Sequence, residues 1–145
     1  MKYNYLSILI ISIILVSCVS AESETLKKAR SRQAEMLKAA QIIDSLIILN
    51  SKNIDGELAN MSQDTTLSAD STKLAAYMEM REKSSFYAEL QNALSDWRIQ
   101  TKLLPENGID ATAFPEGTTD ADVLTSIENA DKALNEIKLG CEAGR

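Results

Sequence analysis

The segment DSTKLAAYMEMREKSSFYAELQNALSDWRIQTKLL, residues 70–104, decides the fold of this chain. It contains neither glycine nor proline, and its apolar side chains recur every three or four residues, the spacing of one face of an α-helix. Asp70 supplies an N-cap, and Pro105 follows the segment. We therefore predict a helix over residues 70–103, about 45 to 50 Å long. Its packing face is Leu74, Tyr77, Met80, Ser84, Tyr87, Leu90, Leu94, Trp97, Thr101 and Leu104.

Residues 22–50 predict a first long helix before this segment. Their apolar residues follow the alternating three- and four-residue steps that are typical of coiled-coil packing. Around Ile42, Leu46 and Leu49 the apolar surface becomes wider than one stripe. We therefore expect that end of the helix to be buried on several sides or to bind a partner.

A loop and a last helix complete the pattern. Gly56 and the polar turn residues at 63–66 predict a loop over residues 52–70. A short helix over residues 54–61 inside that loop is an alternative. Thr119, with Asp122 three positions later, resembles a capping box that begins the last helix, and Gly140 resembles its C-cap.

Three amphipathic helices without sustained β alternation predict an all-α fold. The expected architecture is a small up-down helical bundle of three main helices, with a short fourth as the alternative. We assign residues 1–17 to a signal peptide, residues 18–24 to a lipid-anchored linker and residues 25–145 to the bundle. Because the apolar faces are wide for so few helices, we also expect that the bundle can form a homo-oligomer.

The N-terminal segment has the features of a bacterial export signal. Lys2 precedes an apolar run at residues 6–16, which is shorter than the roughly 20 residues of a membrane-spanning helix. The tetrapeptide LVSC, residues 15–18, resembles a bacterial lipobox, in which the cysteine is acylated and the chain is cut before it. The resemblance implies a lipidated Cys18 anchored in the membrane. Val19, in place of Asp, then implies an outer-membrane lipoprotein that faces the periplasm.

Two alternatives for this segment stay open. Val19, Ser20 and Ala21 also suit ordinary signal peptidase, which would release a soluble secreted chain cleaved after Ala21. An uncleaved anchor between Lys2 and Lys27 is the other alternative.

The composition excludes several kinds of chemistry. The chain has no histidine, which excludes triads with an imidazole base and histidine-ligated zinc. None of its five glycines belongs to a phosphate-binding loop. Its 15 Lys and Arg against 21 Asp and Glu argue against a nucleic-acid surface. We therefore predict that the protein is not an enzyme, has no catalytic, metal-binding or cofactor-binding residue, and binds no nucleic acid.

The charges are distributed unevenly along the chain. Basic residues concentrate at 27–38, and acidic residues concentrate at 106–145. The basic segment could lie against anionic lipid head groups or an acidic partner. The pattern favours the other interpretation, a solvated helix face whose charges the acidic part offsets within the fold.

Cys141 and the aromatic residues add three candidate contacts. With Cys18 acylated or removed, Cys141 has no cysteine partner in its own chain. It could then form a disulfide with a second chain, stay a free thiol, or pack as a small apolar side chain at a helix end. Tyr87 and Trp97 fit the buried face of the second helix. Phe86 lies off that face, and we therefore expect it to contact a partner or a neighbouring helix.

Two short segments resemble parts of the cytochrome c-prime family of four-helix bundles. These are Arg32 and Gln33 ahead of Met36, and FPEGT at residues 114–118. The family's Cys-x-x-Cys-His haem-attachment motif is absent, so the resemblance implies no more than a haemless relative and transfers no site. A periplasmic carrier that binds a small ligand or cofactor in its core is therefore an alternative function.

The leading hypothesis is a lipid-anchored helical protein of the bacterial envelope. It would act as a non-catalytic adaptor or accessory component that binds another protein, because anchoring raises its effective concentration near partners at the same membrane. The candidate partner-binding residues are Ile42, Leu46, Leu49 and Phe86.

Overall fold

The computed structural model describes residues 22–104 and 114–144, and it contains three helices and no strand within them. Helix α2 spans Glu24–Ser62, α3 spans Ser71–Gln100 and α4 spans Asp120–Ala143. The predicted all-α, up-down helical bundle is confirmed. Residues 1–21, which include the predicted signal, Cys18 and the alternative cleavage site at Ala21, lie outside the described residues.

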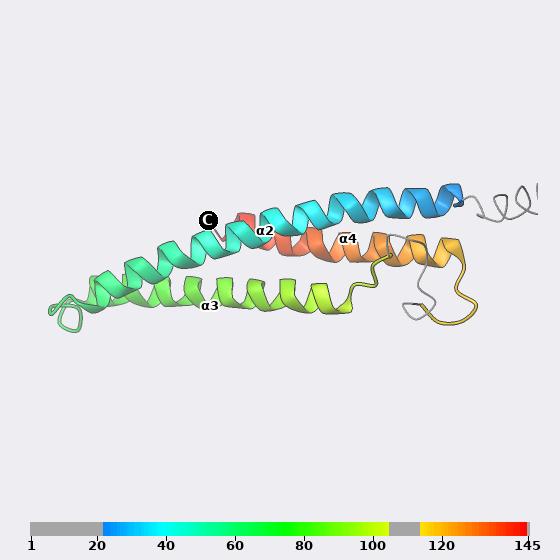
Figure 1. The fold of residues 1–145 in the computed structure, drawn as a ribbon. Helices are drawn as coiled ribbons and strands as arrows, with labels where there is room; N and C mark the ends of the chain where they lie inside the picture. Colours follow the sequence, from blue (N-terminus) through cyan, green and yellow to red (C-terminus); the bar gives the residue numbers. More distant parts are fainter. Residues whose placement is uncertain (1–21, 105–113, 145) are drawn as a thin grey trace, which may run out of the picture.

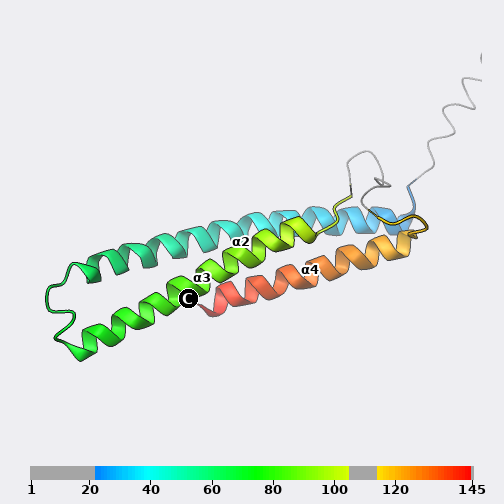
Figure 2. The same cartoon turned by 90° about the horizontal axis from the view of Figure 1, so that it is seen from below.

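The three helices are staggered along one rod. Helix α2 runs beside α4 in its first half and beside α3 in its second half (Figure 1). Helices α2 and α4 run in the same direction, and α3 runs against both (Figure 2). All three therefore overlap only around the middle of α2. We call this overlap the three-helix region, and the part of α2 and α3 beyond the end of α4, residues 51–84, the distal hairpin.

Two clusters of buried apolar side chains hold the helices together. The larger one fills the three-helix region, and the smaller one lies at the end of the rod where α4 begins. The larger cluster contains Met36, Ala40, Ile43, Ile47, Tyr87, Leu90, Leu94, Trp97, Leu134 and Cys141. The smaller one contains Ala29, Leu104, Phe114, Val123 and Ile127. Half of the predicted packing face of the second helix, from Tyr87 onward, lies in these clusters, whereas Leu74 near its beginning is 43% exposed.

A paired amide fixes the chain where it leaves α3. The Gln33 side chain donates a hydrogen bond to the Leu104 carbonyl, at 3.0 Å, and accepts one from the Leu104 amide, at 2.7 Å. At the same end of the rod, the Ser23 hydroxyl donates a hydrogen bond to the Asp120 carboxylate. The Gln33 contacts fix α2 to the chain that follows α3, and the Ser23 contact fixes the beginning of α2 to the beginning of α4.

The first helix is longer than the sequence pattern predicts. The predicted loop at residues 52–62 is wrong, because α2 continues to Ser62 and absorbs the alternative short helix at 54–61. Gly56 weakens a helix by only about 1 kcal/mol relative to alanine. Half-buried side chains on the same helical spacing, Ile54, Leu58 and Met61, continue the packing face past it. The predicted turn at residues 63–66 is confirmed.

The last helix also differs at its end. The predicted capping box is present: the Thr119 amide donates to Asp122 at 2.9 Å, and the Asp122 amide donates to the Thr119 hydroxyl at 3.2 Å. Gly140 is not the C-cap, because α4 continues to Ala143 and Gly144 follows it. A Cβ atom on Gly140 would lie 3.0 Å from the Leu90 side chain. Gly140 therefore allows α4 to lie close to α3.

Candidate functional site

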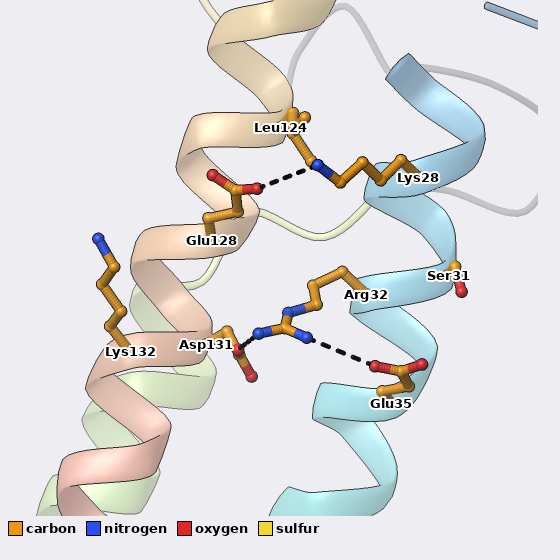
Figure 3. Close-up of a pocket in the computed structure, with 8 residues that line it drawn as sticks. All are labelled: Lys28, Ser31, Arg32, Glu35, Leu124, Glu128, Asp131 and Lys132. Carbon is orange, nitrogen blue, oxygen red and sulfur yellow. Dashed lines mark ion pairs between the residues drawn. The ribbon is translucent and has the colours of Figure 1, made fainter. Parts of the chain in front are cut away.

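The strongest candidate for a binding surface is the outer groove between α2 and α4. It contains a cleft of about 480 Å³ with charged walls (Figure 3). We call the whole surface between the two helices the α2–α4 groove. The residues that line its cleft are Lys28, Ser31, Arg32, Glu35, Leu124, Glu128, Asp131 and Lys132. Figure 3 shows the Lys28 and Arg32 side chains of α2 reaching toward Glu128 and Asp131 of α4 across it.

Ion pairs cross the α2–α4 groove. The Arg32 guanidinium lies 2.7 Å from the Asp131 carboxylate and 3.7 Å from the Glu35 carboxylate. Lys28 lies 3.9 Å from Glu128. Because these groups are partly exposed, each pair contributes about 1 kcal/mol or less to stability. The pairs confirm that the acidic C-terminal part offsets the basic segment within the fold.

Lys132 differs from the other charged residues of the groove. It lies on the outer flank of α4 and takes no part in the ion pairs drawn in Figure 3. Lys132 is exposed, so its ammonium group is available on the surface. Together the groove residues carry equal numbers of positive and negative charges, so a complementary partner would also carry both signs.

Apolar side chains continue the same two helix faces beyond the charged cleft. On α2, Ile42 follows Glu35 by seven residues and is 62% exposed, and Leu49, seven residues further, is 55% exposed. On α4, Leu139 follows Lys132 by seven residues and is 59% exposed. Residues seven apart on a helix lie on nearly the same side. The groove therefore has a charged part and an apolar continuation.

The structure separates the four candidate partner-binding residues into two pairs. Ile42 and Leu49 are exposed, whereas Leu46 and Phe86 are half-buried and pack against the larger core cluster. Leu139 was not among the residues predicted from the sequence, although its seven-residue spacing from Lys132 could have indicated it.

Phe86 contacts a neighbouring helix. Its ring packs edge-on against Tyr87, with 5.7 Å between the ring centroids and 75° between the planes. A Cβ atom added to Gly144 would lie only 2.6 Å from the Phe86 ring. Phe86 therefore covers the C-terminal end of α4.

Cys141 and Trp97 are both core residues. Cys141 is fully buried in the larger cluster. This position agrees with the alternative in which Cys141 packs as a small apolar side chain at a helix end. A disulfide to a second chain would require the last turn of α4 to move. Trp97 is 7% exposed, and its indole N–H donates a 2.8 Å hydrogen bond to the Ala130 carbonyl.

Residues 22–104 and 114–144 include no group of three or more Cys, Asp or Glu placed to hold a metal ion. None of the three helices is long and apolar enough to cross a membrane. A second cleft, of about 490 Å³, lies between α3 and α4 beside Trp97 and Lys102. Small side chains such as Ala93 and Ala133 line much of it.

No protein-family model matches the chain, and no curated protein sequence or solved structure is significantly similar to it. What the chain does is therefore inferred from its own residues.

Proposed function

We propose that this protein is an exported, lipid-anchored adaptor of the bacterial cell envelope that binds another protein through the exposed face of α2. The observation that carries the proposal is the exposure of Ile42 and Leu49, two large apolar side chains on one line of the helix. Burying two such side chains at an interface contributes about 1.5 to 3 kcal/mol each.

The position of Cys18 supports a role close to a membrane. Helix α2 begins six residues after Cys18, with Ser23 as its N-cap. Six residues span at most about 20 Å, so a lipid on Cys18 would keep this end of the rod near the bilayer. The 39 residues of α2 extend about 58 Å from there. Ile42 would lie roughly 30 Å along the helix, within reach of other envelope proteins.

Mass spectrometry of the mature N-terminus tests the anchoring. We expect a chain that starts at an acylated Cys18. A chain that starts at Glu22 would keep the exposed face of α2 on a soluble protein, and an intact chain starting at Met1 would contradict export by either peptidase. The carrier alternative stays a prediction, and a bound ligand in the purified protein would support it.

Chemical crosslinking followed by affinity capture from the producing cells tests the binding face. We expect the native chain to capture an envelope protein, and the double variant Ile42→Gln/Leu49→Gln to lose it. Ile99→Gln is the matched control, because Ile99 is 79% exposed on α3 and lies outside the proposed face. Equal capture by all three proteins would contradict the proposal, provided that circular dichroism shows the same helicity.

A further inference from the structure

We infer that a second copy of this chain occupies the α2–α4 groove, in a parallel dimer whose two-fold axis runs along the rod. The inference rests on the proposed function, in which this face binds protein, and it assigns Ile42 to the second copy and Leu49 to a different protein. In such a dimer, α2 of each copy lies against α4 of the other. The two interfaces are identical by symmetry, as in most dimers of identical chains.

The charges of the groove are self-complementary in this arrangement. The ion pairs place Lys28 level with Glu128, and Arg32 level with Asp131. Glu35 and Lys132 line opposite walls of the same cleft. Each charge on the α2 wall thus has an opposite charge near its level on the α4 wall. When the α2 wall of one copy faces the α4 wall of the other, opposite charges meet along the whole cleft.

Lys132 gives this arrangement a specific contact. Its ammonium group lies on the outer flank of α4, outside the ion pairs within the groove (Figure 3). In the parallel dimer the Glu35 carboxylate of the second copy approaches this flank. Two Glu35–Lys132 ion pairs would therefore join the copies, one on each side of the axis.

The apolar residues distinguish a parallel dimer from an antiparallel one. Two turns beyond Glu35 and Lys132, the groove continues as Ile42 on α2 and Leu139 on α4, both more than half exposed. A parallel dimer brings Ile42 of each copy against Leu139 of the other. An antiparallel dimer centred on the cleft would place both of them beside the first turns of the opposite helices. Only the parallel arrangement buries this apolar pair.

Membrane anchoring agrees with the same arrangement. Two copies that are both lipidated at Cys18 have the first turns of α2 at one membrane surface. A parallel dimer keeps both anchors at the same end of the rod. Leu49 lies two turns beyond Ile42, close to the level where α4 ends, and is therefore at the edge of the dimer interface, where a different protein can contact it.

Charge reversal and mixing of the full chain, purified in detergent, test the dimer. We expect the native chain to form a dimer in sedimentation equilibrium. Glu35→Lys places lysine against Lys132 of the second copy, and Lys132→Glu places glutamate against Glu35, each at two contacts. Each variant alone should dimerise about tenfold more weakly. An equimolar mixture should recover native affinity, because both contacts in the mixed dimer again join opposite charges.

The mixture separates this dimer from its alternatives. A repulsion within one chain would not be relieved by mixing. An antiparallel dimer would place Glu35 near Lys28 and Lys132 near Glu128 of the second copy, so the mixture would stay as weak as the single variants. A monomeric native chain, unchanged dimerisation in both variants, or no recovery in the mixture would each overturn the inference. The recovery should also weaken at about 1 M salt, which screens exposed charges.

Failure of this inference and failure of the adaptor role give different results. A native monomer that captures an envelope protein through Ile42 and Leu49 would leave the adaptor proposal intact and exclude the dimer. A dimer that captures no other protein would support the dimer and contradict the adaptor proposal. The single variant Leu49→Gln should lose the captured protein while the dimer persists.

Discussion

The three-helix region and the distal hairpin share α2 and α3, yet the two regions bury these helices to very different extents. In the three-helix region each helix packs between two others, and Tyr87, Ile47 and Leu94 are almost completely buried. In the distal hairpin α2 and α3 have only one another, and no side chain between residues 51 and 84 is fully buried. The third helix therefore determines whether an amphipathic face becomes core.

This difference predicts an uneven distribution of stability. Most helical stability in proteins comes from packing of the apolar face, and segments with few buried contacts open locally. The distal hairpin retains cross-helix contacts such as the 3.3 Å hydrogen bond from Ser84 to Asp55, but these are exposed. We expect it to open without unfolding the three-helix region.

The largest expected effect comes from one substitution made in both regions of α3. Leu94 is 1% exposed in the core, and Leu74 is 43% exposed in the distal hairpin. Leu94→Ala should lower the free energy of unfolding by about 3 kcal/mol, because it removes buried apolar atoms and leaves a cavity. Leu74→Ala should lower it by less than about 1 kcal/mol. Urea unfolding followed by circular dichroism measures both, and similar losses would contradict the comparison.

A smaller effect should distinguish two glycines that both lie inside helices. Around Gly56 in the distal hairpin, a Cβ atom would meet nothing within 4 Å. Gly56→Ala should therefore stabilise the chain by about 1 kcal/mol and slow amide hydrogen exchange in the hairpin. Gly140→Ala should stabilise the chain less than Gly56→Ala, or destabilise it, because the new Cβ would lie 3.0 Å from the Leu90 side chain. Equal increases in the unfolding temperature of the two variants would show that the packing of α4 does not depend on the close approach of Gly140 to α3.

These two glycines also show how far the sequence alone could predict the fold. The three- and four-residue spacing was enough to predict three helices and the buried role of Tyr87 and Trp97. It could not determine whether Gly56 ends a helix or Gly140 caps one. That depends on which neighbour lies beside each glycine in the folded chain, so both boundaries were predicted wrongly.

The candidate site was predictable only in part. The wide apolar surface of the first helix correctly indicated that Ile42 and Leu49 differ from an ordinary core stripe. Which of the neighbouring residues would be exposed depended on where α4 packs, and Leu46 and Phe86 became half-buried beside it. The α2–α4 groove joins residues about 100 positions apart, such as Lys28 and Glu128. Spacing within one helix cannot reveal such a pairing.

The smallest expected effect is the response of the hairpin tip to pH. The Lys73 ammonium group lies 2.7 Å from the Asp64 carboxylate, which also accepts hydrogen bonds from Thr66. The contact with Lys73, followed by those with Thr66, lowers the pKa of Asp64 well below its ordinary value of 3.8. Its stabilising contribution is therefore fully present above pH 3.8 and is lost as the pH falls through the lowered value.

Amide chemical shifts measured by NMR in acid test this response, with Asp64→Asn as the control. The Asp122 carboxyl at the other end of the rod also has a lowered pKa, because the Thr119 hydroxyl and amide donate to it. Both Thr66 and Thr119 should report protonation of their carboxyl partners in the native chain, and only Thr119 should do so in Asp64→Asn.

Because the distal hairpin opens separately, protonation of Asp64 should loosen residues near the tip and leave the amides around Tyr87 protected. Simultaneous loss of protection at Tyr87 would mean that the rod unfolds as one unit.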